Sequence, residues 1–351
     1  MRRVLFLSCF ALGAGAAALA CVGDDPALTG VPATDDAATD ASTTPPSDAP
    51  AVDSSAADGG GDPVDSGGPR CALDKPFATA MLLKGISSAA DETGVWVSAD
   101  ELTAYVAVSP QGGSASAIRR STRPARGVDF SAHADAPVLA AINGGGFAAT
   151  VPSMTSDGLV FFAARANNTA ENGMYVSVRA STGVAFPPPT RARSRANPIS
   201  LGDPFITPGG ESLVMARDNG VNSFELDEAP RDIGRVYGDG GFVDYAVAPG
   251  VVNVNDDVAA DRRPVVSKDR LTLVFASNRA PGSGANSDLY IASRAGVGGI
   301  FTSPLRIPEP VSSNAADLPG TLSDDGCALY FTSSRAGGFG GFDVYVALRG
   351  K

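Results

Sequence analysis

The chain has 351 residues, of which 44% are hydrophobic, 7% aromatic and 19% charged, and its formal net charge is −11. Its 41 Gly and 26 Pro favour a β protein rich in turns over a helical one. This acidic balance argues against the basic surface that nucleic acid binding requires, so we expect no nucleic acid partner.

The first 20 residues have the form of a secretory signal peptide, with Arg2 and Arg3 before an apolar stretch that ends in small residues. A transmembrane anchor fits less well, because the apolar stretch is short. The residues from Ala18 to Cys21 resemble the lipobox of bacterial lipoproteins, in which the cysteine becomes the lipidated first residue. This resemblance implies a membrane anchor at Cys21. Since Val22 and not Asp follows, it also implies an outer-membrane lipoprotein that faces the periplasm or the surface.

Residues 21–70 are predicted to be a disordered linker. After Cys21 they are rich in Ala, Asp, Ser, Thr, Pro and Gly, with ten Asp, one Arg and no aromatic residue. Such a segment cannot bury enough apolar surface to offset its ordering entropy. As a flexible coil it would span roughly 40 Å and hold the folded domain, residues 71–351, away from the membrane.

Five copies of one pattern occupy the rest of the chain. The clearest reads "SDDGCALYFTSSRAGGFGGFDVYV" at 323–346, the next covers 267–294, and the others begin at Ser156, Thr207 and Ser98. A turn such as Ser-x-Asp-Gly precedes an apolar strand, a glycine-containing loop and a second strand that alternates. A further strand lies in the variable stretch between copies, for example at 299–307. Four antiparallel strands per copy, at intervals of roughly 50 to 60 residues, predict the blades of a propeller.

This pattern, with Ser-x-Arg after the apolar strand and Asp-hydrophobic-Tyr after the loop, resembles the WD-like propeller repeat of TolB and of related periplasmic and lipoprotein chains. The resemblance covers nearly all of residues 71–351. It implies an all-β propeller of about five four-stranded blades. Because TolB's propeller has six blades, a degenerate sixth within 127–154 is the alternative.

The two ends of the domain are predicted to close the last blade together. The chain ends after the third strand of the last copy, and residues 75–85 stand where other copies carry their fourth strand. Cys71 precedes this stretch and Cys327 lies in the blade that it would complete. We therefore expect a Cys71–Cys327 disulfide, which an exported protein can keep, with two free buried thiols as the alternative.

Candidates for chemistry are few. His133 is the only histidine, which argues against His-rich metal sites and Ser-His-Asp triads, and we expect it to be an ordinary loop residue. Aspartates recur once per blade, as structural residues do. We predict ion pairs within blades between Arg279 and Asp288 and between Arg335 and Asp343, and we expect no catalytic residue, metal or cofactor.

The leading hypothesis is a monomeric, non-enzymatic envelope protein that binds another protein or a cell-wall polymer. One alternative is a carbohydrate-active hydrolase or lyase, which would need paired carboxylates about 5–10 Å apart around the central funnel. The other alternative is a sugar-binding lectin, which would need exposed aromatic residues at equivalent positions of several blades.

Overall fold

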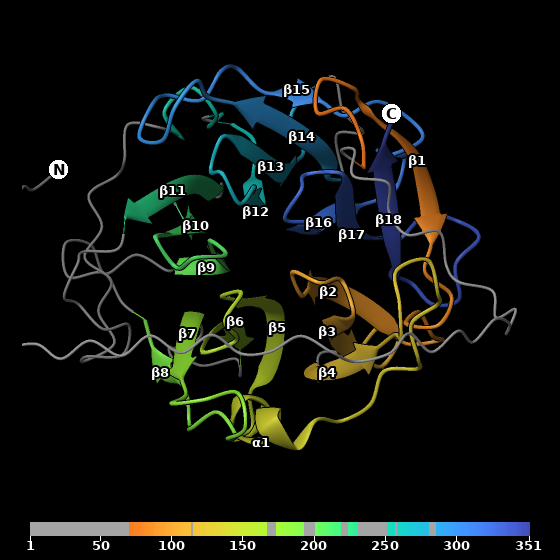
Figure 1. Cartoon of the computed structure of the whole chain (residues 1–351), viewed down its shortest axis with the longest axis vertical. Coiled ribbons are helices and arrows are strands. Elements are labelled where there is room, and N and C mark those ends of the chain that lie inside the picture. The colour runs from red at the N-terminus through yellow and green to blue at the C-terminus, as the bar shows by residue number, and fades with distance from the viewer. Residues whose placement is uncertain are drawn as a thin grey trace, which may run out of the picture. The chain divides into compact units, whose positions relative to one another are not determined.

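Five antiparallel sheets surround a common centre in the computed structural model of the chain (Figure 1). The structure describes residues 70–113, 115–166, 173–192, 201–218, 224–230, 251–256, 258–280 and 286–351. The helices whose full extent is described are the short η1 (Pro137–Leu139) and α1 (Ala140–Asn143). No helix in this part of the chain is long and apolar enough to cross a bilayer.

Each sheet is one blade. The strands are β1 (Phe77–Leu82), β2 (Asp91–Val97), β3 (Thr103–Ser109), β4 (Ala117–Thr122), β5 (Ala148–Met154), β6 (Val160–Ala166), β7 (Gly173–Val178), β8 (Thr190–Arg191), β9 (Leu201–Ile206), β10 (Ser212–Asp218), β11 (Phe224–Pro230), β12 (Asp261–Val266), β13 (Thr272–Ser277), β14 (Asp288–Ser293), β15 (Leu305–Arg306), β16 (Asp317–Leu322), β17 (Ala328–Ser333) and β18 (Asp343–Arg349). The first blade is β2–β4, the second β5–β8, the third β9–β11, the fourth β12–β15 and the fifth β16–β18 with β1.

The predicted five-bladed propeller is confirmed. In the described residues three blades have four strands and two have three, and the fourth position of the first blade is reduced to a single bridge between Arg120 and Ala134. The stretch 127–154 holds this bridge, the two short helices and β5, and therefore no sixth blade.

The N-terminal strand completes the last blade, as predicted. β1 pairs with β18 in antiparallel register, so that Met81 lies opposite Val346, and the order in this sheet is β1-β18-β17-β16. Figure 1 shows β1 beside β18 near the C-terminus. The strand therefore covers an edge that would otherwise be open.

The core lies between neighbouring blades. The runs of β13 and β17 are almost wholly buried, as expected of strands covered on both faces. Phe275 stacks on Tyr290 with 5.8 Å between ring centroids, and Phe331 stacks on Tyr345 at 5.7 Å. Trp96 is buried and packs against Tyr105.

In each blade, the same kind of turn joins the innermost strand to the second strand. Its fourth residue has positive φ in all five blades: Glu101 (63°), Gly158 (71°), Gly210 (76°), Arg270 (61°) and Gly326 (70°). In the second blade the turn starts at Thr155 and not at Ser156, because the Thr155 hydroxyl donates to Asp157 at 2.6 Å. We call the end of the propeller that carries these turns the turn face.

An arginine after the third strand fixes the turn in four blades. The Nε of Arg294 donates to the carbonyl of Arg270 at 2.7 Å, and its guanidinium stacks on Phe301 at 4.3 Å. The same two contacts recur for the other three arginines and their rings, Arg123 with Phe130, Arg179 with Phe186, and Arg349 with Phe77. Phe77 comes from β1, so the closing strand supplies the ring that the first, second and fourth blades take from the loop after their own third strand.

Candidate functional site

The predicted disulfide between Cys71 and Cys327 is present on the turn face. The Cα atoms are 5.6 Å apart, within the usual range for disulfides, and both residues are buried. The Ala72 N–H also donates to the Gly350 carbonyl at 2.9 Å, so backbone and sulfur together tie the start of the domain to its end. We call this junction the clasp.

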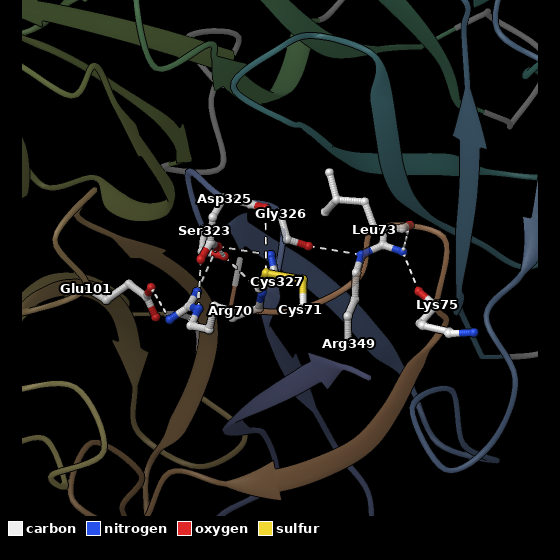
Figure 2. The surroundings of a disulfide bond; sticks show 11 residues. Arg70, Cys71, Leu73, Lys75, Glu101, Ser323, Asp325, Gly326, Cys327 and Arg349 are labelled. Atoms are coloured by element: carbon white, nitrogen blue, oxygen red, sulfur yellow. Dashed lines mark hydrogen bonds and ion pairs between the residues drawn. A yellow bond between two sulfur atoms is a disulfide. The ribbon is translucent and has the colours of Figure 1, made fainter. Parts of the chain in front are cut away.

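Arg70 extends the clasp toward the first blade. Its guanidinium donates to Asp325 at 2.8 Å and lies 2.7 Å from Glu101, which Figure 2 shows on its opposite side. Burial raises the pKa of Asp325, but the Ser323 hydroxyl, the Cys327 N–H and Arg70 outweigh it, and the net pKa is lowered. The carboxylate form of Asp325 is thus the one that the fold favours.

Glu101 is a buried carboxylate at the turn position where other blades carry Gly or Arg. It accepts a hydrogen bond from the Tyr330 hydroxyl at 2.6 Å, and the guanidiniums of Arg126 and Arg123 lie 3.4 and 3.7 Å away. Burial and then the nearby Glu101 carboxylate raise the pKa of Tyr330, so the phenol remains protonated and donates. Three guanidiniums, counting that of Arg70, therefore surround a single carboxylate.

A cavity of about 480 Å³ opens beside this cluster, between the fifth and first blades. We call it the clasp cavity. Its polar wall includes Arg70, Arg126, Arg349 and Lys351, and its apolar wall includes Met81, Val128 and Leu348. A second cavity of about 400 Å³ lies on the turn face toward the fourth blade, and Arg349 lines both.

The centre of the ring, in contrast, is filled. The space between the innermost strands measures only about 10 Å³, enough for one water at most. The Arg263 Nη1 donates across it to the Thr93 carbonyl at 2.9 Å, and the Arg263 Nε lies 3.3 Å from Asp203. Burial lowers the pKa of Arg263, although the Asp203 carboxylate opposes this.

The predicted ion pairs of the fourth and fifth blades are wrong in their partners. Arg279 contacts Asp261 at 2.5 Å and not Asp288, which accepts from Arg306 instead. Arg335 contacts Asp317 at 2.7 Å and not Asp343, whose Oδ2 accepts the N–H groups of the glycine-rich loop. In both blades, the arginine that follows the second strand therefore pairs with the aspartate that begins the innermost strand.

His133 lies in a loop, as predicted, but it is largely buried. Its Nε2 is 3.2 Å from Glu92 Oε1 and 3.3 Å from Ser88 Oγ, and the same Glu92 oxygen accepts from Ser88 at 2.6 Å. A nucleophile triad needs its carboxylate on the other ring nitrogen, and Nδ1 has no partner in the structure. Ser88 and His133 therefore serve to satisfy the buried Glu92 carboxylate by hydrogen bonding.

Several predictions concern residues that the structure does not describe. Cys21 and the linker lie outside the described residues, so lipidation and the tether remain predictions. Among the residues that are described, no group of three His, Cys, Asp or Glu is placed to hold a metal ion. Sequence reasoning missed Arg70, Glu101 and Arg126. The signal available was an acidic residue, Glu101, at a turn position where glycine recurs.

Comparisons with known proteins concern the fold. No family model matches the sequence, and no curated protein matches it. TolB from Acinetobacter baumannii is 14% identical over 75% of this chain and 56% of its own length, with a TM-score of 0.37. A GH62 α-L-arabinofuranosidase domain from Coprinopsis cinerea is 9% identical, with coverage of 78% and 97% and a TM-score of 0.45.

An exo-β-1,3-galactanase from Phanerochaete chrysosporium is similar to the same degree, at 11% identity, coverage of 77% and 64%, and a TM-score of 0.45. Sequence identities this low describe a similarity of fold and say nothing about function. The assignment of the chain depends on its own five blades and on the repeat that builds them. The chain is a five-bladed β-propeller.

Proposed function

We propose that the mature chain is a lipid-anchored protein of the bacterial cell envelope that binds another envelope protein or a cell-wall polymer without transforming it. The lipid would be carried by Cys21, and the acidic linker would hold the propeller away from the membrane. The observation that carries the proposal is the contrast between the filled ring centre and the cavities on the turn face. A partner would therefore bind at the turn face and not along the axis.

The carboxylates around the centre support binding over hydrolysis. In the described residues, Asp203, Asp261 and Asp317 each contact an arginine. A glycosidase needs one carboxyl group free to give a proton and another free to attack or to activate water. Carboxylates that are each held by a guanidinium are suited to fixing the blades.

The direct test is photocrosslinking in intact cells. A benzophenone amino acid replaces Val128 at the clasp cavity or, as the matched control, Val258 at the other end of the innermost strands; both valines are exposed. We expect a discrete adduct from position 128, identified by mass spectrometry as a protein or as cell-wall material, and none from position 258. No adduct at 128, or the same adducts at both positions, would overturn the proposal.

The enzymatic alternative has its own readout. The purified full chain is incubated with cell-wall polysaccharide, and new reducing ends and unsaturated products are measured. We expect neither to exceed the blank. Cleavage that disappears on Asp203→Asn replacement would establish a hydrolase or lyase instead.

A further inference from the structure

We infer that the clasp cavity is a binding site for a small anionic amphiphile, with a carboxylate or phosphate head and an apolar tail. The inference goes beyond the proposed function, because it adds a small-molecule ligand on the same face of the propeller. Its evidence is that one cavity is lined both by more basic than acidic side chains and by exposed apolar side chains.

The charge of the wall is the first step. Arg70, Arg123, Arg126, Arg349 and Lys351 line the cavity, against the carboxylates of Glu101 and Asp129. Glu101 is already shared by three of these arginines, and Arg70 also pairs with Asp325 outside the cavity. Positive charge therefore exceeds negative charge at this wall, although the chain as a whole carries −11.

Two arginines have donors left for a ligand. Arg126 is half exposed, and among the residues that the structure describes only its Nε has polar contacts, with the carbonyl of Asp100 at 3.2 Å and with Glu101 at 3.4 Å. Arg349 donates to the carbonyls of Gly326, Leu73 and Lys75, and it contacts no carboxylate in the part of the chain that the structure describes. Burial lowers the pKa of Arg349, as expected where no anion offsets its charge. Guanidiniums placed in this way match the paired oxygens of a carboxylate or phosphate.

The apolar wall is the second step. Met81, Val128 and Leu348 line the same cavity, and their exposed fractions are 44%, 46% and 39%. They come from β1, from the loop after β4 and from β18, so the blade closure is what brings them together. Apolar groups left in contact with water beside a charged wall mark a site for a ligand that has both kinds of surface.

The site is preformed. Glu101 is buried and held by Tyr330, Arg70 and Arg123, and the disulfide fixes one side of the cavity. Its volume of about 480 Å³ falls within the range of roughly 300–1,000 Å³ that is usual for small-molecule sites. A ligand would therefore bind without first ordering the walls.

The test is calorimetric titration of the full chain with decanoate and decyl phosphate below their micelle concentrations, and with decyltrimethylammonium as the cationic counterpart. We expect both anions to bind at one site, more weakly as salt is added, and the cation not to bind. A tenfold preference for the phosphate or for the carboxylate would identify the head group. Equal binding of the cation, or no binding of either anion, would overturn the inference.

Variants locate the site. Arg126→Gln should weaken anion binding by roughly tenfold, the usual effect of losing one charge-assisted hydrogen bond. Val128→Asp should weaken it at least as much. The matched control is Arg119→Gln, an exposed arginine on β4 that pairs with Asp135 away from the cavity, and it should bind as the parent does. All three should keep the parent melting temperature, since the side chains are exposed.

Unchanged affinity in both cavity variants would place the ligand elsewhere and overturn the inference. The photocrosslinking result separates this failure from failure of the proposed function. If position 128 still captures its partner while the anions bind equally to all variants, the binding role stands and the ligand class is wrong.

Discussion

Arg335 makes contacts that tie three segments of the fifth blade together. It lies 2.7 Å from the buried Asp317, donates to Ser333 and to the carbonyls of the preceding loop, and stacks on Tyr345. Removing one partner of a buried ion pair leaves the other charge without compensation. The cost of such a change greatly exceeds that of breaking an exposed pair.

Arg335→Ala should therefore lower the free energy of unfolding by about 3 kcal/mol, because Asp317 is left buried and unpaired. Urea unfolding followed by intrinsic fluorescence measures it. Arg119→Ala, which breaks the exposed pair with Asp135, is the control and should cost less than about 1 kcal/mol. Equal effects of the two replacements would contradict the assignment.

The Asp325 carboxylate makes the clasp sensitive to acid. Its pKa is lowered in the fold, so its contribution to stability is present above the unfolded pKa of about 3.9 and is lost as the pH falls through the folded value. Asp325→Asn should be less stable than the parent at pH 7, and the difference should shrink as the pH falls below about 4. Urea midpoints at pH 7 and pH 3 test this. A difference that stays constant with pH would show that the charge is not involved.

The sequence could not predict which aspartate each arginine pairs with. The predicted pairs of Arg279 with Asp288 and of Arg335 with Asp343 assumed that each arginine contacts the next aspartate along the chain. Both arginines contact an aspartate of the innermost strand instead. In the sequence, 159–165 and 273–279 have the same spacing, which would align Arg165 with Arg279. In the sheet Arg165 lies opposite Gly173, as Ser277 lies opposite Asp288, so its counterpart is Ser277. Side-chain direction depends on strand register, which spacing alone does not fix.

At the scale of the element, four of the five blades are held by a third-strand arginine that bonds a turn carbonyl and stacks on a phenylalanine. The phenylalanine follows the arginine at the same interval in three blades, at positions 130, 186 and 301 after 123, 179 and 294. In the fifth blade the ring is Phe77, from the far end of the chain. The closing strand is therefore an integral part of its blade.

Phe77→Ala should destabilise the propeller as much as Phe301→Ala, by about 3–5 kcal/mol, because both rings are buried under an arginine. Chemical denaturation of the two variants measures this. Val128→Ala, exposed on the turn face, serves as the comparison and should have little effect. A Phe77 variant with the stability of the parent would mean that β1 adds little to the last blade.

The elements were predictable where the pattern is local. The five turns, the buried second strands and the closing strand follow from glycine or aspartate placement and from apolar runs. The arginine and phenylalanine pair was also visible in the sequence as a fixed spacing, but its meaning needs the turn carbonyl in three dimensions. The clasp cavity was not predictable, since its walls come from segments that only the closure of the ring brings together.

At the scale of the molecule, the two ends of the propeller domain are joined by a strand pair, a disulfide and the Arg70 contacts. The disulfide spans a sequence separation of 256 residues, and in the chain-entropy model a loop this long contributes about 5.5 kcal/mol. The same closure shapes the clasp cavity, so stability and binding depend on one structural feature.

Replacing Cys71 and Cys327 together by Ala should lower the free energy of unfolding by up to about 5 kcal/mol and should not change the fold. Thermal unfolding with and without reductant measures this. Reductant should shift the parent and leave the double variant unchanged. A parent that does not respond to reductant in denaturant would show that the bridge contributes nothing.

The central claim is that the two ends of the domain close the propeller through the clasp. The most direct measurement is peptide mass spectrometry of the full chain isolated from its native cells, alkylated in denaturant and digested with trypsin without reduction. We predict one disulfide-linked species that joins peptide 71–84 to peptide 307–335, since trypsin does not cleave between Lys75 and Pro76. Both peptides recovered separately, each with an alkylated cysteine, would contradict the account.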